Sequence, residues 1–290
     1  MKKVLKILFI LGAVNGILWL MIFSIPPPTV ESEIYFLDVG QGDSQFLSLA
    51  GANPAPVSIL IDGGPGRAVV EELARLTKTQ KQYIDVLAAT HPQDDHIGGL
   101  VDVLQAYEVG LLITNGRRSE IASYKRLINL AEERGVPIIV LGAGDVIRYG
   151  KNQIDILAPT AALRRDPEIN NASLVMYLAA ETSAGPLRAL FTGDAGFPVE
   201  NYLINNFDFQ TDILKVGHHG SKYASGREFL EAIAPKVAVI EVGKNRYGHP
   251  TAETLNRLKQ QGASIYDTLN DGTVKIMSRN DQLLIYRREK

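Results

Sequence analysis

The densest group of chemically capable side chains lies in the segment from Thr90 to Gly99. It holds histidines and aspartates, which suit a divalent cation that prefers nitrogen and oxygen ligands. A solitary histidine more often caps a helix or fills a hydrogen-bonded position in the core, but several such side chains in one short loop favour a metal site. The candidate ligands in this loop are His91, Asp94, Asp95 and His96.

Later segments supply more groups of the same kind. Asp194 follows an apolar stretch at 187–191, and the pair His218-His219 follows another at 213–216. Loops at strand ends commonly carry functional residues because the sheet holds them in place. Thr192-Gly193-Asp194 is also an ordinary connection from a strand into a turn, so both interpretations stay open at this stage.

Composition narrows the possible chemistry. The 290 residues include no cysteine, which excludes disulfides, thiolate metal ligands and a cysteine nucleophile. Any bound metal must therefore be held by nitrogen and oxygen. The formal net charge of −2 gives no global reason to expect strong binding to nucleic acid or to an acidic membrane surface. Recognition of phosphate must be local.

Basic residues near these loops are the local candidates for phosphate contacts. They are Lys215, Lys222, Lys244 and Arg246. Each is equally well explained as a solvated surface charge. The segment Gly64-Pro65-Gly66 is more typical of a turn than of a phosphate-binding loop.

Short apolar strands and amphipathic helices alternate around these loops. Two strand-rich halves, each accompanied by helices, predict an α/β protein with two sheets packed face to face and helices outside. Strands are expected at 34–37, 45–50, 57–61, 84–89, 138–141, 153–157, 174–180, 187–191, 213–216, 237–240, 274–278 and 283–287. Helices are expected at 69–76, 100–107, 119–134, 198–206, 227–233 and 252–261.

The amino-terminal segment differs from everything after it. Three lysines precede an apolar run from Ile7 to Ile25, and prolines close the run. A membrane-spanning helix needs about 20 apolar residues, and the preceding lysines place its amino terminus in the cytoplasm. We therefore predict a single-pass anchor in the cytoplasmic membrane over 1–28 and an extracytoplasmic globular domain over 29–290.

A cleaved signal peptide is the competing interpretation of this segment, and secretion would be its consequence. Signal peptidase prefers small residues at the first and third positions before the cut. Between Met21 and Pro28 only Ser24 is small, so retention as an anchor is favoured. The lysine flank and the proline stop disfavour a third interpretation, a buried core helix.

Seven motifs occur in a recognisable order along the chain. They are FLDVGQGDS at 36–44, LIDGG at 60–64, THPQDDHIGG at 90–99, NNASLV at 170–175, FTGD at 191–194, LKVGHHGS at 214–221 and VGKNRYGHP at 242–250. The third resembles the HxHxDH signature of metallo-β-lactamase-fold hydrolases. The whole set resembles the extracytoplasmic domain of the bacterial competence protein ComEC and its stand-alone relatives, from Ile34 to the end of the chain.

This resemblance implies an αββα sandwich of the metallo-β-lactamase type, with an N-terminal transmembrane helix, that binds two divalent ions, zinc or manganese. By the same resemblance, His91 would bind the first ion, Asp95 and His96 the second, and Asp194 would bridge the two. One of the paired histidines would complete the second ion's ligands. We favour His218 because it lies nearer the strand end.

The resemblance also assigns expected roles outside the ligands. Asp62 would orient the site through hydrogen bonds to ligands. Catalytic candidates are Asp95, which would orient the attacking water, together with His219 and His249. Substrate contacts are expected from Asn245, Lys222 and Arg246. The segment Gly248-His249-Pro250 is also an ordinary signal for a helix start, so the role of His249 stays open.

Gln93 departs from the family pattern, which has histidine or aspartate at this position. A neutral amide is a poor metal ligand. Either the first ion is held weakly, or Asp94 replaces Gln93 beside it. The second metal position is therefore the better supported of the two.

The function that these features favour is a metal-dependent hydrolase using a metal-activated water. The resemblance to the competence group implies a phosphodiester substrate, including single-stranded DNA, and the basic residues near the loops are its local support. The alternatives are a hydrolase of phosphocholine esters, lactones or β-lactams on the same fold, and a non-catalytic membrane-associated binding protein. The sequence identifies no protein partner.

Overall fold

Two β-sheets lie face to face in the computed structural model, which describes residues 31–51, 56–76, 82–182, 185–280 and 282–288. Within these residues one sheet has eight strands, in the order β15 (Gln282–Arg287), β14 (Val274–Arg279), β1 (Glu33–Phe36), β2 (Gln45–Leu49), β3 (Val57–Ile61), β4 (Tyr83–Ala89), β5 (Glu108–Thr114) and β6 (Ile138–Val140). The other has seven, in the order β13 (Ser264–Asp267), β12 (Val237–Ile240), β11 (Ile213–Lys215), β10 (Leu187–Phe191), β9 (Val175–Ala180), β8 (Asn152–Ala158) and β7 (Val146–Tyr149).

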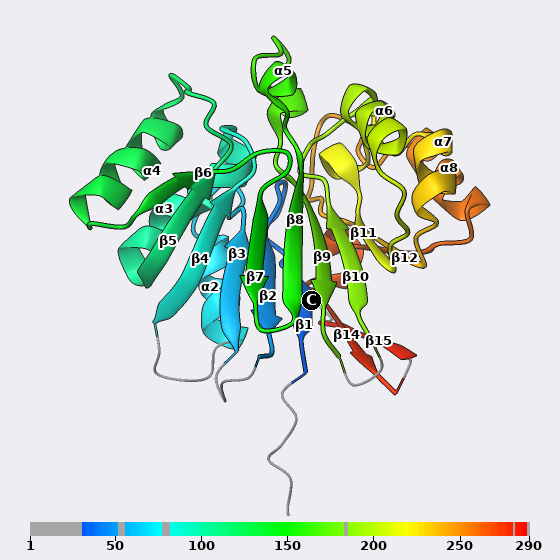
Figure 1. Cartoon of the computed structure of the whole chain (residues 1–290), viewed down its shortest axis with the longest axis horizontal. Coiled ribbons are helices and arrows are strands. Elements are labelled where there is room, and N and C mark those ends of the chain that lie inside the picture. The colour runs from blue at the N-terminus through cyan, green and yellow to red at the C-terminus, as the bar shows by residue number, and fades with distance from the viewer. Residues whose placement is uncertain (1–30, 52–55, 77–81, 183–184, 281, 289–290) are drawn as a thin grey trace, which may run out of the picture. The chain divides into compact units, whose positions relative to one another are not determined.

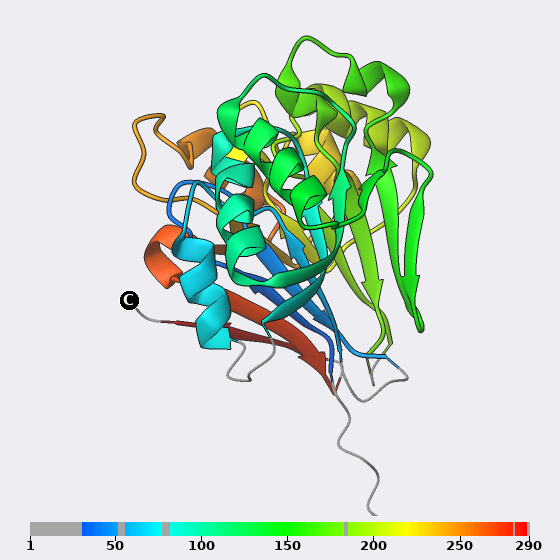
Figure 2. The same cartoon turned by 90° about the vertical axis from the view of Figure 1, so that its left-hand side faces the viewer.

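Each sheet is covered on its outer face by helices (Figures 1 and 2). Helices α2 (Ala68–Leu76), α3 (Asp94–Ala106) and α4 (Ala122–Glu133) pack on the first sheet, and α6 (Phe197–Asn206), α7 (Arg227–Ile233) and α8 (Ala252–Gln260) on the second. Strands β3 to β6 and strands β10 to β13 run parallel. Parallel neighbours need crossover connections, and these helices supply most of them.

The principal core lies between the two sheets. Alternate residues of the facing strands point inward, so that Phe36 of β1 and Phe191 of β10 lie with ring centroids 6.2 Å apart. Two further apolar clusters fill the spaces between each sheet and its helices. Three apolar layers therefore hold four structural layers together, as an αββα sandwich requires.

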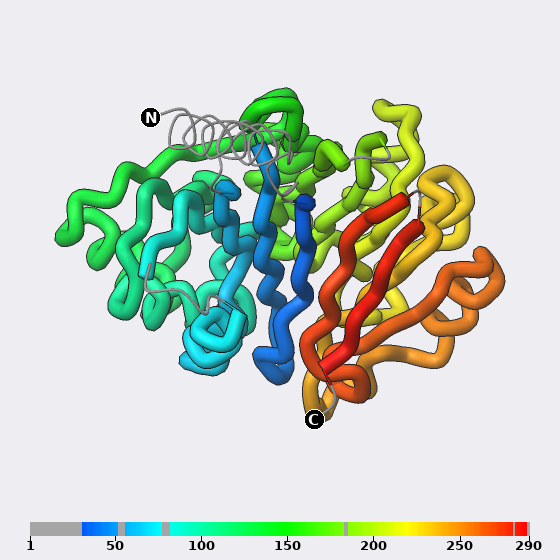
Figure 3. The backbone as a smooth tube through the Cα atoms, turned by 90° about the horizontal axis from the view of Figure 1, so that it is seen from below, coloured from blue at the N-terminus to red at the C-terminus, as the bar shows by residue number. Residues whose placement is uncertain are grey.

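The end of the described chain completes the first sheet. Strand β14 pairs antiparallel with β1, and β15 pairs with β14 (Figure 3). Pairing of β14 with β1 covers an edge that β1 would otherwise expose.

The expected two-sheet α/β architecture is confirmed, with local differences. Helix α3 begins at Asp94 rather than Leu100, so Asp95 and His96 lie in its first turn instead of in a loop before it. Strands β5, β7 and β13 were not expected from the sequence. The predicted anchor over 1–28 lies outside the described residues, and none of the helices in the described part is long and apolar enough to cross a membrane.

Candidate metal centre

Strand ends from both sheets deliver the candidate residues to one place. Asp62 directly follows β3, His91 comes two residues after β4, and Asp194 and His219 follow β10 and β11. The two strands concerned in each sheet, β3 with β4 and β10 with β11, are parallel neighbours. Their carboxyl ends therefore lie at the same end of the sheet. The site is therefore assembled across the mouth of the sandwich.

The first turn of α3 is held tightly against the loop after β3. The amide of Gly63 donates to the His96 carbonyl at 2.6 Å, and the amide of Gly99 donates to the Gly64 carbonyl at 2.8 Å. Glycine at position 99 permits this approach, because a Cβ there would lie 2.0 Å from the Gly63 oxygen. Asp62 adopts a left-handed φ of 54° at this junction, a conformation that costs energy in a non-glycine residue.

The two adjacent histidines after β11 point to different places. Both have left-handed backbones, with φ of 48° and 51°. His219 is buried, and its Nε2 lies 3.4 Å from Asp95 Oδ2 and 3.6 Å from Asp194 Oδ2. His218 is 35% exposed, with Nε2 3.8 Å from Asp194 Oδ2. The structure thus places His219 inside the cluster and His218 at its rim, whereas we expected His218 as the ligand.

Hydrogen bonds fix which ring nitrogen of each buried histidine faces the cluster. Nδ1 of His96 lies 2.7 Å from Asp62 Oδ2, and Nδ1 of His219 lies 2.8 Å from the Glu241 carbonyl oxygen. An Nδ1–H donating to these oxygens leaves the lone pair on Nε2. Both Nε2 atoms are buried without a hydrogen-bond partner, as is Asp194 Oδ1, which lies 3.3 Å from His96 Nε2. This donor set fits a divalent cation.

Asp43 is a member of the cluster that the sequence analysis did not assign. Asp43, His96, Asp194 and His219 each offer a ligand atom, and these atoms all lie within 4.8 Å of one another. The amide of Asp43 also donates to the Asp95 carbonyl at 3.1 Å, which ties the loop before β2 to the start of α3. The available signal was its place in the motif at 36–44, directly before a strand.

Lys215 corrects the expectation of a phosphate contact at that position. Its side chain is fully buried, forms an ion pair with Asp43 and donates to the Gly193 carbonyl at 2.8 Å. Its ammonium lies 3.8 Å from Asp194 Oδ1. A buried lysine paired in this way contributes positive charge to the cluster from the protein interior. It cannot reach a substrate in solvent.

Opposite charges dominate the electrostatics of the cluster. Burial by itself would lower the pKa values of His96 and His219, but the carboxylates of Asp194 and Asp43 raise them, to about 10 for His219. Burial favours the neutral form of Asp194, yet His219 and His96 hold its pKa well below the usual range. A divalent cation would take the place of the protons on these imidazoles.

The residues expected to hold the first ion form a less complete group. Nε2 of His91 lies 2.9 Å from Gln93 Oε1, and its Nδ1 lies 3.0 Å from Thr90 Oγ1. Burial, with a further contribution from His96, lowers the pKa of His91 to about 3, so its ring is neutral and able to bind metal. Asp94, one of the two alternatives raised by Gln93, is exposed and accepts a hydrogen bond from Ser123 of α4.

A pocket of about 610 Å³ opens over the cluster. Its lining residues come from loops and helix starts beside both sheets and are Gln41, Pro65, Gln93, Asp94, Asp95, Ile121, Asn170, Asp194, His218, His219, Tyr247 and His249. Lys222 and Arg246 are exposed on neighbouring loops. The side chain of Asn245, an expected substrate contact, is instead occupied by hydrogen bonds within its own loop.

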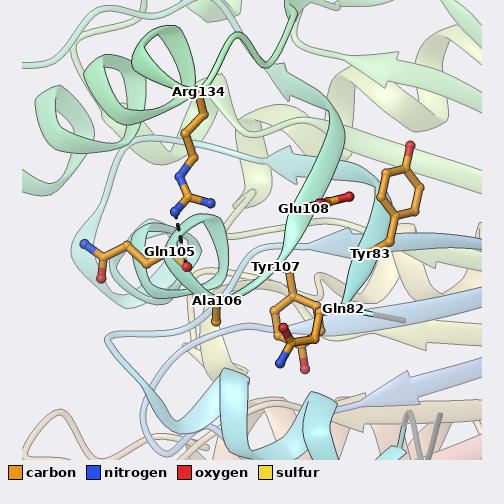
Figure 4. A pocket seen from close by; sticks show the side chains of 7 residues that line it. All are labelled: Gln82, Tyr83, Gln105, Ala106, Tyr107, Glu108 and Arg134. Carbon is orange, nitrogen blue, oxygen red and sulfur yellow. Dashed lines mark hydrogen bonds between the residues drawn. The ribbon is translucent and has the colours of Figure 1, made fainter. Parts of the chain in front are cut away.

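A second hollow, of about 520 Å³, lies at the other end of the first sheet (Figure 4). It is formed where β4 and β5 begin and where α3 and α4 end, and Arg134 donates there to the Gln105 carbonyl at 3.3 Å. Glu108 is the only carboxylate among its lining residues, and no histidine lines it. This hollow has no metal-binding chemistry.

Comparisons with known proteins show the family to which the chain belongs. The model of the metallo-beta-lactamase superfamily matches residues 58–243. ComE operon protein 3 of Bacillus subtilis is 32% identical over 299 residues, covering 96% of this chain and 37% of that protein. Recombination protein 2 of Haemophilus influenzae is 28% identical, covering 86% of this chain and 29% of that protein. The chain thus spans well under half the length of these curated relatives.

Solved structures show the same fold. The metallo-beta-lactamase fold protein YhfI of Bacillus subtilis has a TM-score of 0.57 at 12% identity, covering 85% of this chain and all of that one. Igni18, a metallo hydrolase of Ignicoccus hospitalis, has a TM-score of 0.55 at 16% identity, with 85% and 100% coverage. At these identities the likeness concerns the fold alone.

Proposed function

Since this chain belongs to the metallo-beta-lactamase superfamily and is similar to competence proteins, we propose that it is a metal-dependent phosphodiesterase that cleaves nucleic acid. Membership of the superfamily implies binding of a divalent metal. The observation that carries the proposal is the convergence of two buried imidazole Nε2 atoms without hydrogen-bond partners on Asp194, at the floor of an open pocket.

The better-formed metal position is assigned to Asp95, His96, Asp194 and His219. The carboxylates of Asp95 and Asp194 lie on the Nε2 side of the histidines, at 3.3 to 3.6 Å. Asp43 lies on the Nδ1 side, 3.2 Å from His219 Nδ1, and is already paired with Lys215. We therefore give Asp43 a positioning role, as an oxygen that holds the imidazoles in the orientation that metal binding needs.

A second, weaker position would be formed by His91 and by Asp194 as the shared ligand. Gln93 provides only a neutral amide oxygen there, 2.9 Å from His91 Nε2. Zinc and manganese both accept nitrogen and oxygen ligands, so either ion suits the two positions.

The side chains perform distinct tasks in hydrolysis. A divalent ion bound here supplies a Lewis acid, which activates water and polarises a phosphoryl oxygen. Asp95 is 35% exposed and faces the pocket, so its carboxylate can orient the attacking water and accept its proton. His218 and His249, whose ring centroids are 5.6 Å apart, line the rim and can donate a hydrogen bond or a proton to the leaving oxygen.

Two observations support nucleic acid as the substrate. Recombination protein 2 of Haemophilus influenzae is named for recombination, and a further relative, Competence protein ComA of Neisseria gonorrhoeae, is named for competence. Lys222, Lys244 and Arg246 are exposed on the loops that follow His219 and β12, where they can contact backbone phosphates.

We also propose that residues 1–28 anchor the chain in the cytoplasmic membrane and that the hydrolase domain over 29–290 lies outside it. The apolar run behind three lysines supports the anchor. Membrane fractionation tests the anchor, and protease treatment of spheroplasts or protoplasts tests whether the hydrolase domain lies outside the membrane. Recovery of the chain in the soluble fraction would contradict the anchor.

The decisive experiment combines metal analysis with cleavage assays on the full chain in detergent. We expect wild type to bind zinc or manganese and to cleave single-stranded DNA only when loaded. His219→Ala should lose metal and at least about 100-fold in activity, whereas His218→Ala should keep its metal. Circular dichroism confirms folding of each variant. Cleavage that survives both His219→Ala and Asp194→Ala would refute the proposal, and a folded wild type that binds no metal would favour a non-catalytic binding protein.

A further inference from the structure

The loop between β12 and α8, residues 243–250, carries a large aromatic side chain at the pocket. Tyr247 is 75% exposed and lines the pocket above Asp194 and His219. Single exposed aromatic residues are common on protein surfaces and by themselves indicate nothing. The surroundings of Tyr247 distinguish it.

The loop is fixed in place before any substrate arrives. Asn245 Nδ2 donates to the carbonyls of Gly243 and His249 at 2.9 and 2.8 Å, and Asn245 Oδ1 accepts from the amides of Tyr247 and His249 at 3.1 Å each. The amide of Gly243 also donates to Gln41 Oε1 at 3.2 Å. A loop that is already ordered loses little conformational entropy when it binds a ligand.

A row of rings leads from Tyr247 to the metal centre. The ring of Tyr247 lies 5.9 Å from that of His249, at an interplanar angle of 32°. The ring of His249 lies 5.6 Å from that of His218, whose Nε2 is 3.8 Å from Asp194 Oδ2. Nδ1 of His249 is buried without a hydrogen-bond partner, so a polar atom is left available beside the row.

Charges of the appropriate sign flank the aromatic side chain. Lys244 and Arg246, on the same loop, are both exposed. Proteins that bind single-stranded nucleic acid combine cations for the phosphates with aromatic side chains on which the bases stack. The geometry here provides both within one rigid loop.

We propose that Tyr247 is a specificity-determining residue on which an unpaired base next to the scissile phosphate stacks. This inference rests on the proposed phosphodiesterase function and names its substrate class as single-stranded nucleic acid or an unpaired end. A base inside a duplex has no free face to offer the ring. Lys244 and Arg246 then hold the phosphates on either side of the stacked nucleotide.

The test compares two polymers of equal length and charge, oligothymidylate and a fully abasic phosphodiester chain, with metal-loaded full-length protein. Wild type should have the lower KM for oligothymidylate. Tyr247→Ala should raise that KM about 5- to 150-fold, the range that loss of one stacked base implies. It should leave kcat and the KM for the abasic polymer nearly unchanged. Tyr247→Phe keeps the ring and should behave as wild type.

Tyr286→Ala is the matched control, because Tyr286 is 51% exposed on β15 and does not line the pocket. Equal KM values of wild type for the two polymers, or an equal rise for both in Tyr247→Ala, would overturn the stacking role and leave the phosphodiesterase intact. Failure of wild type to cleave either polymer would overturn the proposed function, and the stacking role with it.

Discussion

At the scale of single residues, the hydrogen bonds on one edge of an imidazole decide what its other edge can bind. His96 and His219 are 123 positions apart in the chain, yet each has its Nδ1 held by an oxygen from another loop, Asp62 for one and Glu241 for the other. Their Nε2 atoms consequently face the same carboxylate, Asp194. The same reasoning separates His219 from His218, which lies beside it in sequence but faces the rim.

Gln93 is the residue where a single substitution should strengthen metal binding. Its Oε1 lies 2.9 Å from His91 Nε2, so Gln93→His would place a second imidazole at the weak metal position. We expect metal content, measured by mass spectrometry after equilibration with zinc, to rise from about one to about two ions per chain. Gln93→Ala is the control and should remain at about one. An unchanged content in Gln93→His would show that the first position is not formed by these residues.

At the scale of elements, the close approach of α3 to the loop after β3 sets the geometry of the centre. Gly99→Ala would bring a Cβ to 2.0 Å from the Gly63 oxygen and 2.6 Å from the Gly66 oxygen, both backbone atoms. Helix α3 must then shift and carry His96 away from Asp62. We expect a loss of about 1–3 kcal/mol in the free energy of unfolding, measured with urea, together with weaker metal binding. Gly66→Ala, where a Cβ meets nothing within 4 Å, should change stability by less than about 0.5 kcal/mol.

Helices α6 and α7 are joined by a carboxyl group away from the centre. Glu200 accepts hydrogen bonds from the amides of Ser225 and Gly226, at the start of α7. Its burial raises the pKa from 4.5 to about 7 despite these bonds. Between these values the folded state binds more protons than the unfolded state, so this group's stabilising contribution is present at low pH and is lost as pH rises to about 7.

Glu200→Gln removes the titration while keeping the shape. Relative to the variant, wild type should lose up to about 3 kcal/mol of unfolding free energy between pH 4.5 and 7. Urea denaturation at several pH values measures the difference, with Glu228→Gln, an exposed carboxylate of α7, as control. A difference between wild type and Glu200→Gln that does not vary with pH would contradict this account.

At the scale of the whole molecule, charge is nearly balanced, so attraction to nucleic acid must come from a few side chains. The net charge is −2, and Lys215 is buried in an ion pair with Asp43, where it cannot contact nucleic acid. Exposed cations lie on the loops that follow His219 and β12: Lys222, Lys244 and Arg246. We expect the logarithm of the affinity for single-stranded DNA to fall with the logarithm of salt concentration with a slope of about −2.

Fluorescence anisotropy with a labelled oligonucleotide between about 50 and 200 mM salt measures this slope. Lys244→Ala should reduce its magnitude by about 0.7. Lys236→Ala, which removes an exposed lysine paired with Asp212, should leave it unchanged. A slope that persists after Lys222, Lys244 and Arg246 are all replaced by alanine would place the binding surface elsewhere.

The sequence by itself determined the αββα architecture and the loops that meet at its mouth. Local patterns sufficed for most elements, because strand alternation, turn residues and ordered motifs are properties of neighbouring positions, but the internal strand β5 was missed. Strand β13 has mixed exposure, and β7 alternates between exposed and partly buried positions at a sheet edge, so neither has the apolar pattern that identified the central strands.

Only the tertiary structure decided which groups meet in the buried cluster. It gave Asp43 a place beside two imidazoles, buried Lys215 beneath them and put His219 rather than His218 inside the cluster. Asn245 was likewise shown to brace its own loop. Burial and the choice of ring nitrogen depend on contacts between residues far apart in the chain, such as Asp62 with His96. The spacing of residues along the sequence does not reveal those contacts.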